Sequence, residues 1–81
     1  MARVHFSAGL RSFTGGVAEL DIEAASVRRL INELDARYPG LGAKLSSGTS
    51  VAINGEIIAD AWYEDLADDA EVHFLETLGG G

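Results

Sequence analysis

The residues best suited by type and position to take part in a reaction are the last four, Leu78 followed by Gly79, Gly80 and Gly81. Glycine has no side chain to pack and loses the most backbone entropy on ordering, so we do not expect this run to join a core. We expect residues 77–81 to form a flexible glycine tail that can enter a narrow channel and present the α-carboxylate of Gly81 to another protein's active site. A frayed terminus is the simpler alternative.

The composition excludes several other kinds of chemistry. There is no cysteine, which removes disulfides, thiolate catalysis and cysteine-ligated metals. The two histidines, His5 and His73, lie far apart in the sequence, so we expect no histidine-rich metal site and no bound cofactor. Thirteen acidic residues against six basic ones give a formal net charge of −7, which argues against nucleic acid and suits a basic protein partner. The charge could equally serve only solubility.

Hydropathy gives no sign of membrane association. No apolar run approaches the ~20 residues that a membrane-spanning helix needs. The first six residues lack the long apolar segment of a signal peptide. We therefore expect a cytoplasmic protein with no membrane contact.

Two alternating segments predict an amino-terminal antiparallel hairpin. Residues 3–8 and 17–23 alternate apolar and polar positions, as a half-buried strand does, and a glycine-containing loop joins them. The residues expected to face inward are Val4, Phe6, Ala8, Ala18, Leu20 and Ile22.

The apolar period then changes from two to about 3.6, which predicts one amphipathic helix. Ser26 is placed to cap its first turn, and the pair Pro39 and Gly40 is placed to end it. Leu41 and Leu45 then suit a further short turn over the edge of the core. The expected buried stripe is Val27, Leu30, Ile31, Leu34 and Tyr38.

Two further strands and a final one complete the pattern. Asn54 and Gly55 between apolar runs predict a hairpin with a type I′ turn. The acidic connection 59–70 is expected to hold a helical turn in which Trp62 covers the core. Residues 71–76 alternate again, with Val72 and Phe74 inward, and lead directly into the tail.

This order of elements predicts an α+β protein with one mixed sheet and a single helix packed across one face. The domain covers residues 1–76 and the tail covers residues 77–81. The opposite face of the sheet should be mostly polar, with His5 and His73 side by side. Its expected residues are His5, Glu19, Asp21, Glu23, Glu71, His73 and Leu75.

A set of short segments, spread over essentially the whole chain, carries a resemblance to a known family. These segments are 6–11, 26–30, 36–41, 51–56, 69–72 and the final Gly80 and Gly81. In their order and spacing the chain resembles the β-grasp sulfur-carrier family, which includes the small subunit of molybdopterin synthase and the thiamin sulfur carrier, with ubiquitin as a more distant relative. The 37–41 segment (Arg-Tyr-Pro-Gly-Leu) is closer to the molybdopterin-synthase subunit.

The sequence departs from this family just before the tail. Many molybdopterin-synthase subunits have two prolines there, where this chain has Glu76 and Thr77. Proline fixes φ and stiffens the chain, whereas Glu and Thr do not. We therefore expect a tail that is more mobile and more polar than in those relatives.

The resemblance implies that Gly81 is adenylated by an ATP-using enzyme similar to the ubiquitin-activating class, and that a sulfur donor then converts it to a thiocarboxylate. An acceptor synthase subunit would receive the sulfur, molybdopterin synthesis being the favoured pathway. Leu78, Gly79 and Gly80 would thread into partners. The protein would be a co-substrate rather than an enzyme, and the resemblance is compatible with the small subunit of a synthase complex. The candidate partner contacts beside the tail are Leu75, Arg11 and Phe74.

Two alternatives remain from the sequence. The chain could be a ubiquitin-like modifier joined through Gly81 to lysines of target proteins, or a β-grasp binding module whose tail is never activated. An independent enzyme is not expected, since no constellation of nucleophile, base and stabilising group is present.

Overall fold

A computed structural model describes residues 1–47 and 49–76. The strands are β1 (Ala2–Phe6), β2 (Glu19–Ile22), β3 (Thr49–Ile53), β4 (Glu56–Ile58) and β5 (Glu71–Glu76). The helices are α1 (Val27–Arg37) and α2 (Leu41–Ser46), with short 3₁₀ turns η1 (Ala8–Leu10) and η2 (Ala61–Tyr63). The predicted order of strands and helix is therefore confirmed.

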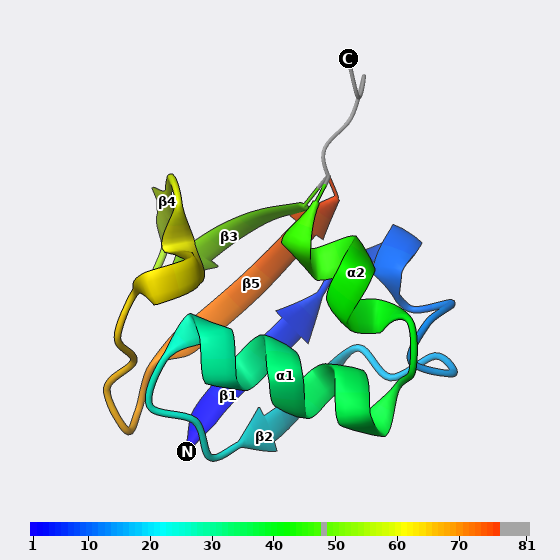
Figure 1. The fold of residues 1–81 in the computed structure, drawn as a ribbon, viewed down its shortest axis with the longest axis horizontal. Helices are drawn as coiled ribbons and strands as arrows, with labels where there is room; N and C mark the ends of the chain where they lie inside the picture. Colours follow the sequence, from blue (N-terminus) through cyan, green and yellow to red (C-terminus); the bar gives the residue numbers. More distant parts are fainter. Residues whose placement is uncertain (48, 77–81) are drawn as a thin grey trace.

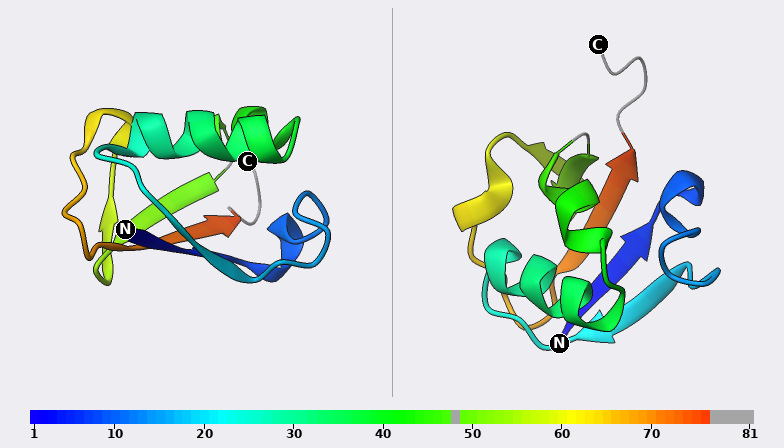
Figure 2. Two further views of the ribbon diagram at one scale, coloured as in Figure 1. Left: turned by 90° about the horizontal axis from the view of Figure 1, so that it is seen from below. Right: turned by 45° about the vertical axis from the view of Figure 1, so that its right-hand side comes forward.

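The five strands form one mixed sheet in the order β2-β1-β5-β3-β4 (Figure 1). The last strand, β5, lies in the middle, parallel to β1 and antiparallel to β3. The two hairpins, β1–β2 and β3–β4, lie on either side of it. Both helices cover the same face of the sheet, and the other face is open (Figure 2).

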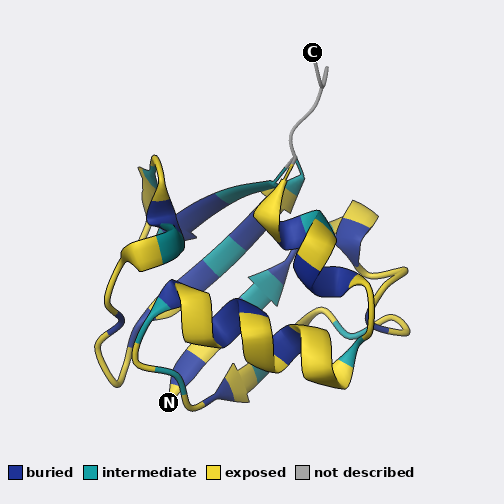
Figure 3. Ribbon diagram, viewed as in Figure 1, coloured by how far each residue is buried: buried dark blue, intermediate teal, exposed yellow. Residues whose placement is uncertain are grey.

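The core lies between α1 and the covered face of the sheet (Figure 3). The helix buries the predicted stripe from Val27 to Leu34, and Tyr38 packs against its edge only partly buried. Each fully buried large apolar side chain contributes about 1.5–3 kcal/mol relative to an exposed one. The strand residues opposite the helix, none more than 2% exposed, are Val4, Phe6, Val72 and Phe74.

Local signals in the sequence set both ends of α1. The Ser26 hydroxyl accepts a hydrogen bond from the Arg29 N–H at 3.3 Å, as an N-cap does. After Arg37 the chain turns through Gly40, whose φ of 97° is in the left-handed region. α2 follows at once and buries Leu41 and Leu45, so the expected short turn over the core is confirmed.

The two remaining turns agree with the predictions. Asn54 and Gly55 have φ values of 51° and 85°, the positive pair that a type I′ hairpin requires. In the acidic connection, η2 places Trp62 partly buried against the core. Within the described residues no helix has both the length and the hydropathy needed to cross a membrane.

The amino-terminal hairpin is shorter than predicted. β1 ends at Phe6 because the chain enters η1, so Ala8 is exposed rather than inward, and Leu10 fills the core instead. β2 begins at Glu19, and Ala18 is also exposed. Both errors concern alanines, whose small side chains gain little from burial and therefore constrain the strand face weakly.

Candidate functional site

The candidate site is the carboxyl end of β5, where the described chain stops at Glu76. The predictions for Leu78, Gly79, Gly80 and Gly81, and the flexible character of residues 77–81, lie outside the described residues and stay predictions. What the structure describes is the platform from which that segment starts. β5 is flanked by β1 and β3, so this platform is the middle of the sheet rather than an edge.

Glu76 is held by contacts to two other parts of the fold. Its backbone N–H donates to the Ser7 hydroxyl at 3.2 Å, and its carboxylate lies 3.3 Å from the Lys44 amine at the end of α2. Ser7 is in turn fixed by its own N–H, which donates to the Phe74 carbonyl at 3.0 Å. Glu76 also pairs with Thr49 in the β3–β5 ladder.

The Glu76 side chain also fills the space above Gly9. A Cβ at position 9 would come within 2.7 Å of the Glu76 Cδ, and closer still to Oε1. Glycine at this position therefore makes room for the carboxylate beside the sheet. We call Glu76, Lys44, Ser7 and Gly9 the exit clamp.

The exit clamp shows how the residue before the tail is held. Glu76 is anchored through both its backbone and its carboxylate. The expected greater mobility and polarity of the tail itself concern residues outside the described structure and stay predictions. Sequence reasoning missed Lys44 entirely. The available signal was that Lys44 is the only lysine in the chain.

Two predicted partner contacts lie together beside the exit clamp. Leu75 is 38% exposed on the open face of the sheet. Arg11 is exposed, and its Nε donates to the Phe6 carbonyl at 3.2 Å, which orients the guanidinium. Leu75 and Arg11 line one shallow hollow together with Ser7, His5 and His73, which these residues could offer to a partner.

The third predicted partner contact, Phe74, is wrong. Phe74 borders the same hollow but has 0% of its surface exposed, because alternation along β5 turns its ring into the core. There it stacks with Phe6 at a centroid distance of 6.2 Å. Its contribution is to the stability of the platform.

The open face of the sheet brings the two histidines together, as predicted. His5 and His73 are register partners in β1 and β5, and their rings stack with centroids 4.2 Å apart. Carboxylates lie on both sides of the His5 ring, with Glu19 3.1 Å from Nδ1 and Glu71 3.2 Å from Nε2. No group of three or more metal-ligating side chains occurs among residues 1–47 and 49–76.

The neighbouring row on this face is ionic. Arg3 donates to the Asp21 carboxylate through Nε at 3.1 Å and Nη2 at 3.4 Å, and Glu19 lies 3.7 Å from its Nη1. The hydrogen bond and charge of Asp21, together with the charge of Glu19, raise the pKa of Arg3 above its usual value. These groups are exposed, so their ion pairs contribute little to the folding stability of the protein. Their main effect is to give this face of the sheet a pattern of charges.

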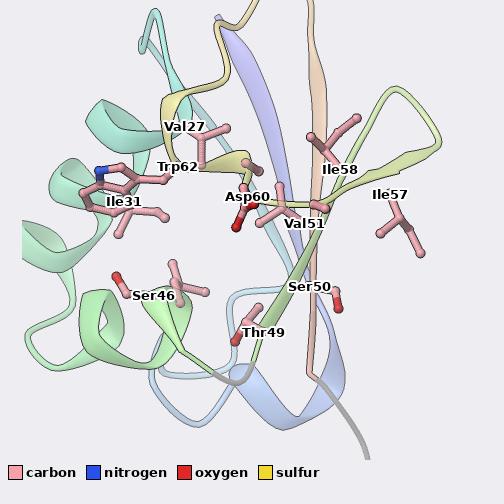
Figure 4. A pocket seen from close by; sticks show the side chains of 13 residues that line it. Val27, Ile31, Ser46, Thr49, Ser50, Val51, Ile57, Ile58, Asp60 and Trp62 are labelled. Atoms are coloured by element: carbon pink, nitrogen blue, oxygen red, sulfur yellow. The ribbon is translucent and has the colours of Figure 1, made fainter.

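A second hollow opens between the helices and the β3–β4 hairpin (Figure 4). Trp62 and Ile31 lie on one side of it, and Val51 and Ile58 on the other (Figure 4). Most of the residues that line it are apolar, and its polar side-chain groups are hydroxyls, the Trp62 indole and a single carboxylate, Asp60, with no histidine or lysine. This hollow does not have the make-up of an active site.

Comparison with known proteins identifies the class and the family. Three solved structures have the same fold. A chain of the Amycolatopsis orientalis BexX/CysO complex is 24% identical, with a TM-score of 0.85 and full coverage of both chains. Small archaeal modifier protein 1 of Methanosarcina acetivorans is 23% identical, with a TM-score of 0.85, over 99% of this chain and 95% of its own.

The third structure, from Pyrococcus furiosus, is described as a molybdopterin converting factor subunit 1. It is 26% identical, with a TM-score of 0.80, over 95% of this chain and 97% of its own. The fold is therefore an α+β β-grasp fold of the class of small sulfur carriers and ubiquitin-like modifiers, as expected. The model of the ThiS family matches residues 4–81, and the chain belongs to that family. No curated protein matches the sequence.

Proposed function

We propose that the protein is a sulfur carrier whose Gly81 carboxylate is adenylated and then converted to a thiocarboxylate. The observation that carries this proposal is the extent of the family match, which runs to residue 81 and so includes the terminal glycines. The central strand β5 leads straight into that segment. No described side chains form a catalytic constellation, which suits a co-substrate acted on by other enzymes.

The chemistry needs activation because a carboxylate is a poor acyl donor. Attack of the Gly81 carboxylate on the α-phosphate of ATP forms the acyl-adenylate and releases pyrophosphate. A hydrosulfide-level donor then attacks the carbonyl carbon, so that a C–S bond forms, the bond to the phosphate oxygen breaks and AMP leaves. The resulting thiocarboxylate sulfur is a nucleophile carried on a segment with no side chain to obstruct its entry into an acceptor enzyme.

The partners implied are an adenylating enzyme of the ubiquitin-activating type, a sulfur donor and an acceptor synthase subunit. Leu75 and the oriented guanidinium of Arg11 are the described residues best placed to meet them. Among acceptor pathways we favour molybdopterin synthesis, on the strength of residues 37–41 and the similarity to the Pyrococcus furiosus protein. ATP is used by the activating enzyme and is not bound by this chain.

The test is the intact mass of the protein after incubation with ATP, an activating enzyme and a sulfur donor, with a Gly81-deleted variant as the control. We expect a mass gain equal to exchange of one oxygen for sulfur in the full chain only. An unchanged mass, with an activating enzyme shown to work on another carrier, would contradict the proposal and favour the binding module. High-mass conjugates in cell extract would instead support a protein modifier.

A further inference from the structure

We propose that Glu76 is a positioning residue, held by the exit clamp so that residues 77–81 start from one defined place and direction. The inference rests on the proposed function, since its purpose is delivery of Gly81 to the activating enzyme. It concerns the four residues of the clamp and the last described peptide of β5.

Three elements distant in sequence meet at Glu76. Ser7 joins β1 to η1, Gly9 lies within η1, and Lys44 comes from α2. Ser7 accepts from the Glu76 N–H at 3.2 Å, Lys44 lies 3.3 Å from Oε2, and Gly9 leaves space for the carboxylate. The backbone and side chain of Glu76 are thus held from two different directions.

Lys44 is itself fixed at its backbone. Its carbonyl accepts a hydrogen bond from the Thr49 hydroxyl at 2.8 Å, which joins the end of α2 to the start of β3. The side chains of Lys44 and Glu76 are 31% and 34% exposed, so their ion pair is more sheltered than the others on the surface. A pair of this kind adds little to folding stability but favours one orientation of the carboxylate.

The consequence is a lower entropic cost when the terminal segment docks to the activating enzyme. An unrestrained start would let the terminal segment sample directions that an activating enzyme cannot use, and binding would have to remove them. The clamp removes part of that freedom beforehand. The ion pair of the clamp works through charge rather than through the ring of a proline, so its share of the effect must weaken as salt rises.

Matched variants can distinguish the effect of the ion pair from the effect of the room that Gly9 leaves for the carboxylate. Gly9→Ala changes no charge, yet its Cβ would displace the Glu76 carboxylate from the site beside Lys44. Glu76→Gln keeps the size of the side chain and removes the charge. Lys44→Arg keeps the charge and serves as the conservative control. The double variant Lys44→Glu with Glu76→Lys exchanges the two charges and should restore the pair.

The experiment has two arms. In the free protein, ¹⁵N relaxation should show faster motion at residues 76 and 77 in Gly9→Ala and Glu76→Gln, and wild-type values in Lys44→Arg and the exchanged double variant. With the activating enzyme, the first two variants should raise KM about threefold to fivefold at low salt with kcat unchanged, the scale of one surface ion pair. Melting temperatures should agree across the set, which excludes a general loss of structure.

Different outcomes separate this inference from the proposed function. Equal relaxation and equal KM in all variants would overturn the positioning role, even if the wild type is adenylated. Altered relaxation in Gly9→Ala and Glu76→Gln, together with a wild type that no activating enzyme adenylates, would overturn the proposed function and leave the clamp established. A change in KM that persists at high salt would overturn the ionic mechanism.

Discussion

The imidazole rings of His5 and His73 lie parallel to within 7°, with centroids 4.2 Å apart, although they come from opposite ends of the described chain. The contact is a direct result of the parallel pairing of β1 with β5, which sets His5 opposite His73. The contact joins two neighbouring strands of the sheet, one of which, β5, carries the carboxyl end of the described domain. Changes to the histidines therefore report on that pairing.

We expect His73→Ala to lower the free energy of unfolding by about 0.5–1.5 kcal/mol, because the stacked pair is lost. His73→Phe retains a flat ring opposite His5 and should cost clearly less. Urea unfolding followed by circular dichroism measures both. An equal loss in the two variants would mean that the stacking itself contributes nothing.

Replacing two leucines, one buried and one on the open face, should change stability by very different amounts. Leu34→Ala removes a side chain with 0% exposure between α1 and the sheet, and we expect a loss of about 2–5 kcal/mol in unfolding free energy. Leu75→Ala, on the open face, should change stability by less than about 0.5 kcal/mol.

If Leu75 is a partner contact, Leu75→Ala should instead weaken binding to the activating enzyme, measured by isothermal titration. Arg11→Ala should weaken it as well, since Arg11 lines the same hollow. Wild-type affinity in both variants would remove this hollow from the partner surface. Leu34→Ala is unsuitable for that measurement because it alters the fold.

The cap of α1 gives a third expectation. Ser26→Ala removes the acceptor of the Arg29 N–H, and we expect a loss of about 1 kcal/mol in unfolding free energy. Ser26→Asp supplies another acceptor and should remain near wild type. The comparison would go against the capping role if alanine and aspartate behaved alike.

The β3–β4 turn gives a fourth. Gly55 has a φ of 85°, where a Cβ is strained although no neighbouring atom lies within 4 Å of its position. Gly55→Ala should therefore cost about 1–2 kcal/mol through the backbone alone. Asn54→Asp, at a φ that Asp tolerates, is the matched control. Thermal melts of the two variants decide the point.

Local patterns determined most of the architecture from the sequence alone. The 3.6-residue period placed α1, Ser26 capped it, and Asn54 with Gly55 placed the second hairpin, because these signals act between residues close in the chain. The order of these elements and the resemblance indicated the sulfur-carrier family. The amino-terminal hairpin was predicted too long because alanine marks a strand face only weakly.

Only the tertiary structure decided how the end of β5 is held. Ser7, Lys44 and Glu76 are far apart in the sequence, and no periodicity relates them, so their meeting depends on the sheet order and on where α2 ends. Phe74 differs, because the alternation along residues 71–76 already predicted its ring inward; its 0% exposure agrees with that prediction and not with a role as a partner contact. Contacts such as those of the exit clamp form because the fold brings segments that are distant in sequence together. A linear pattern of residues does not show which of those segments will meet.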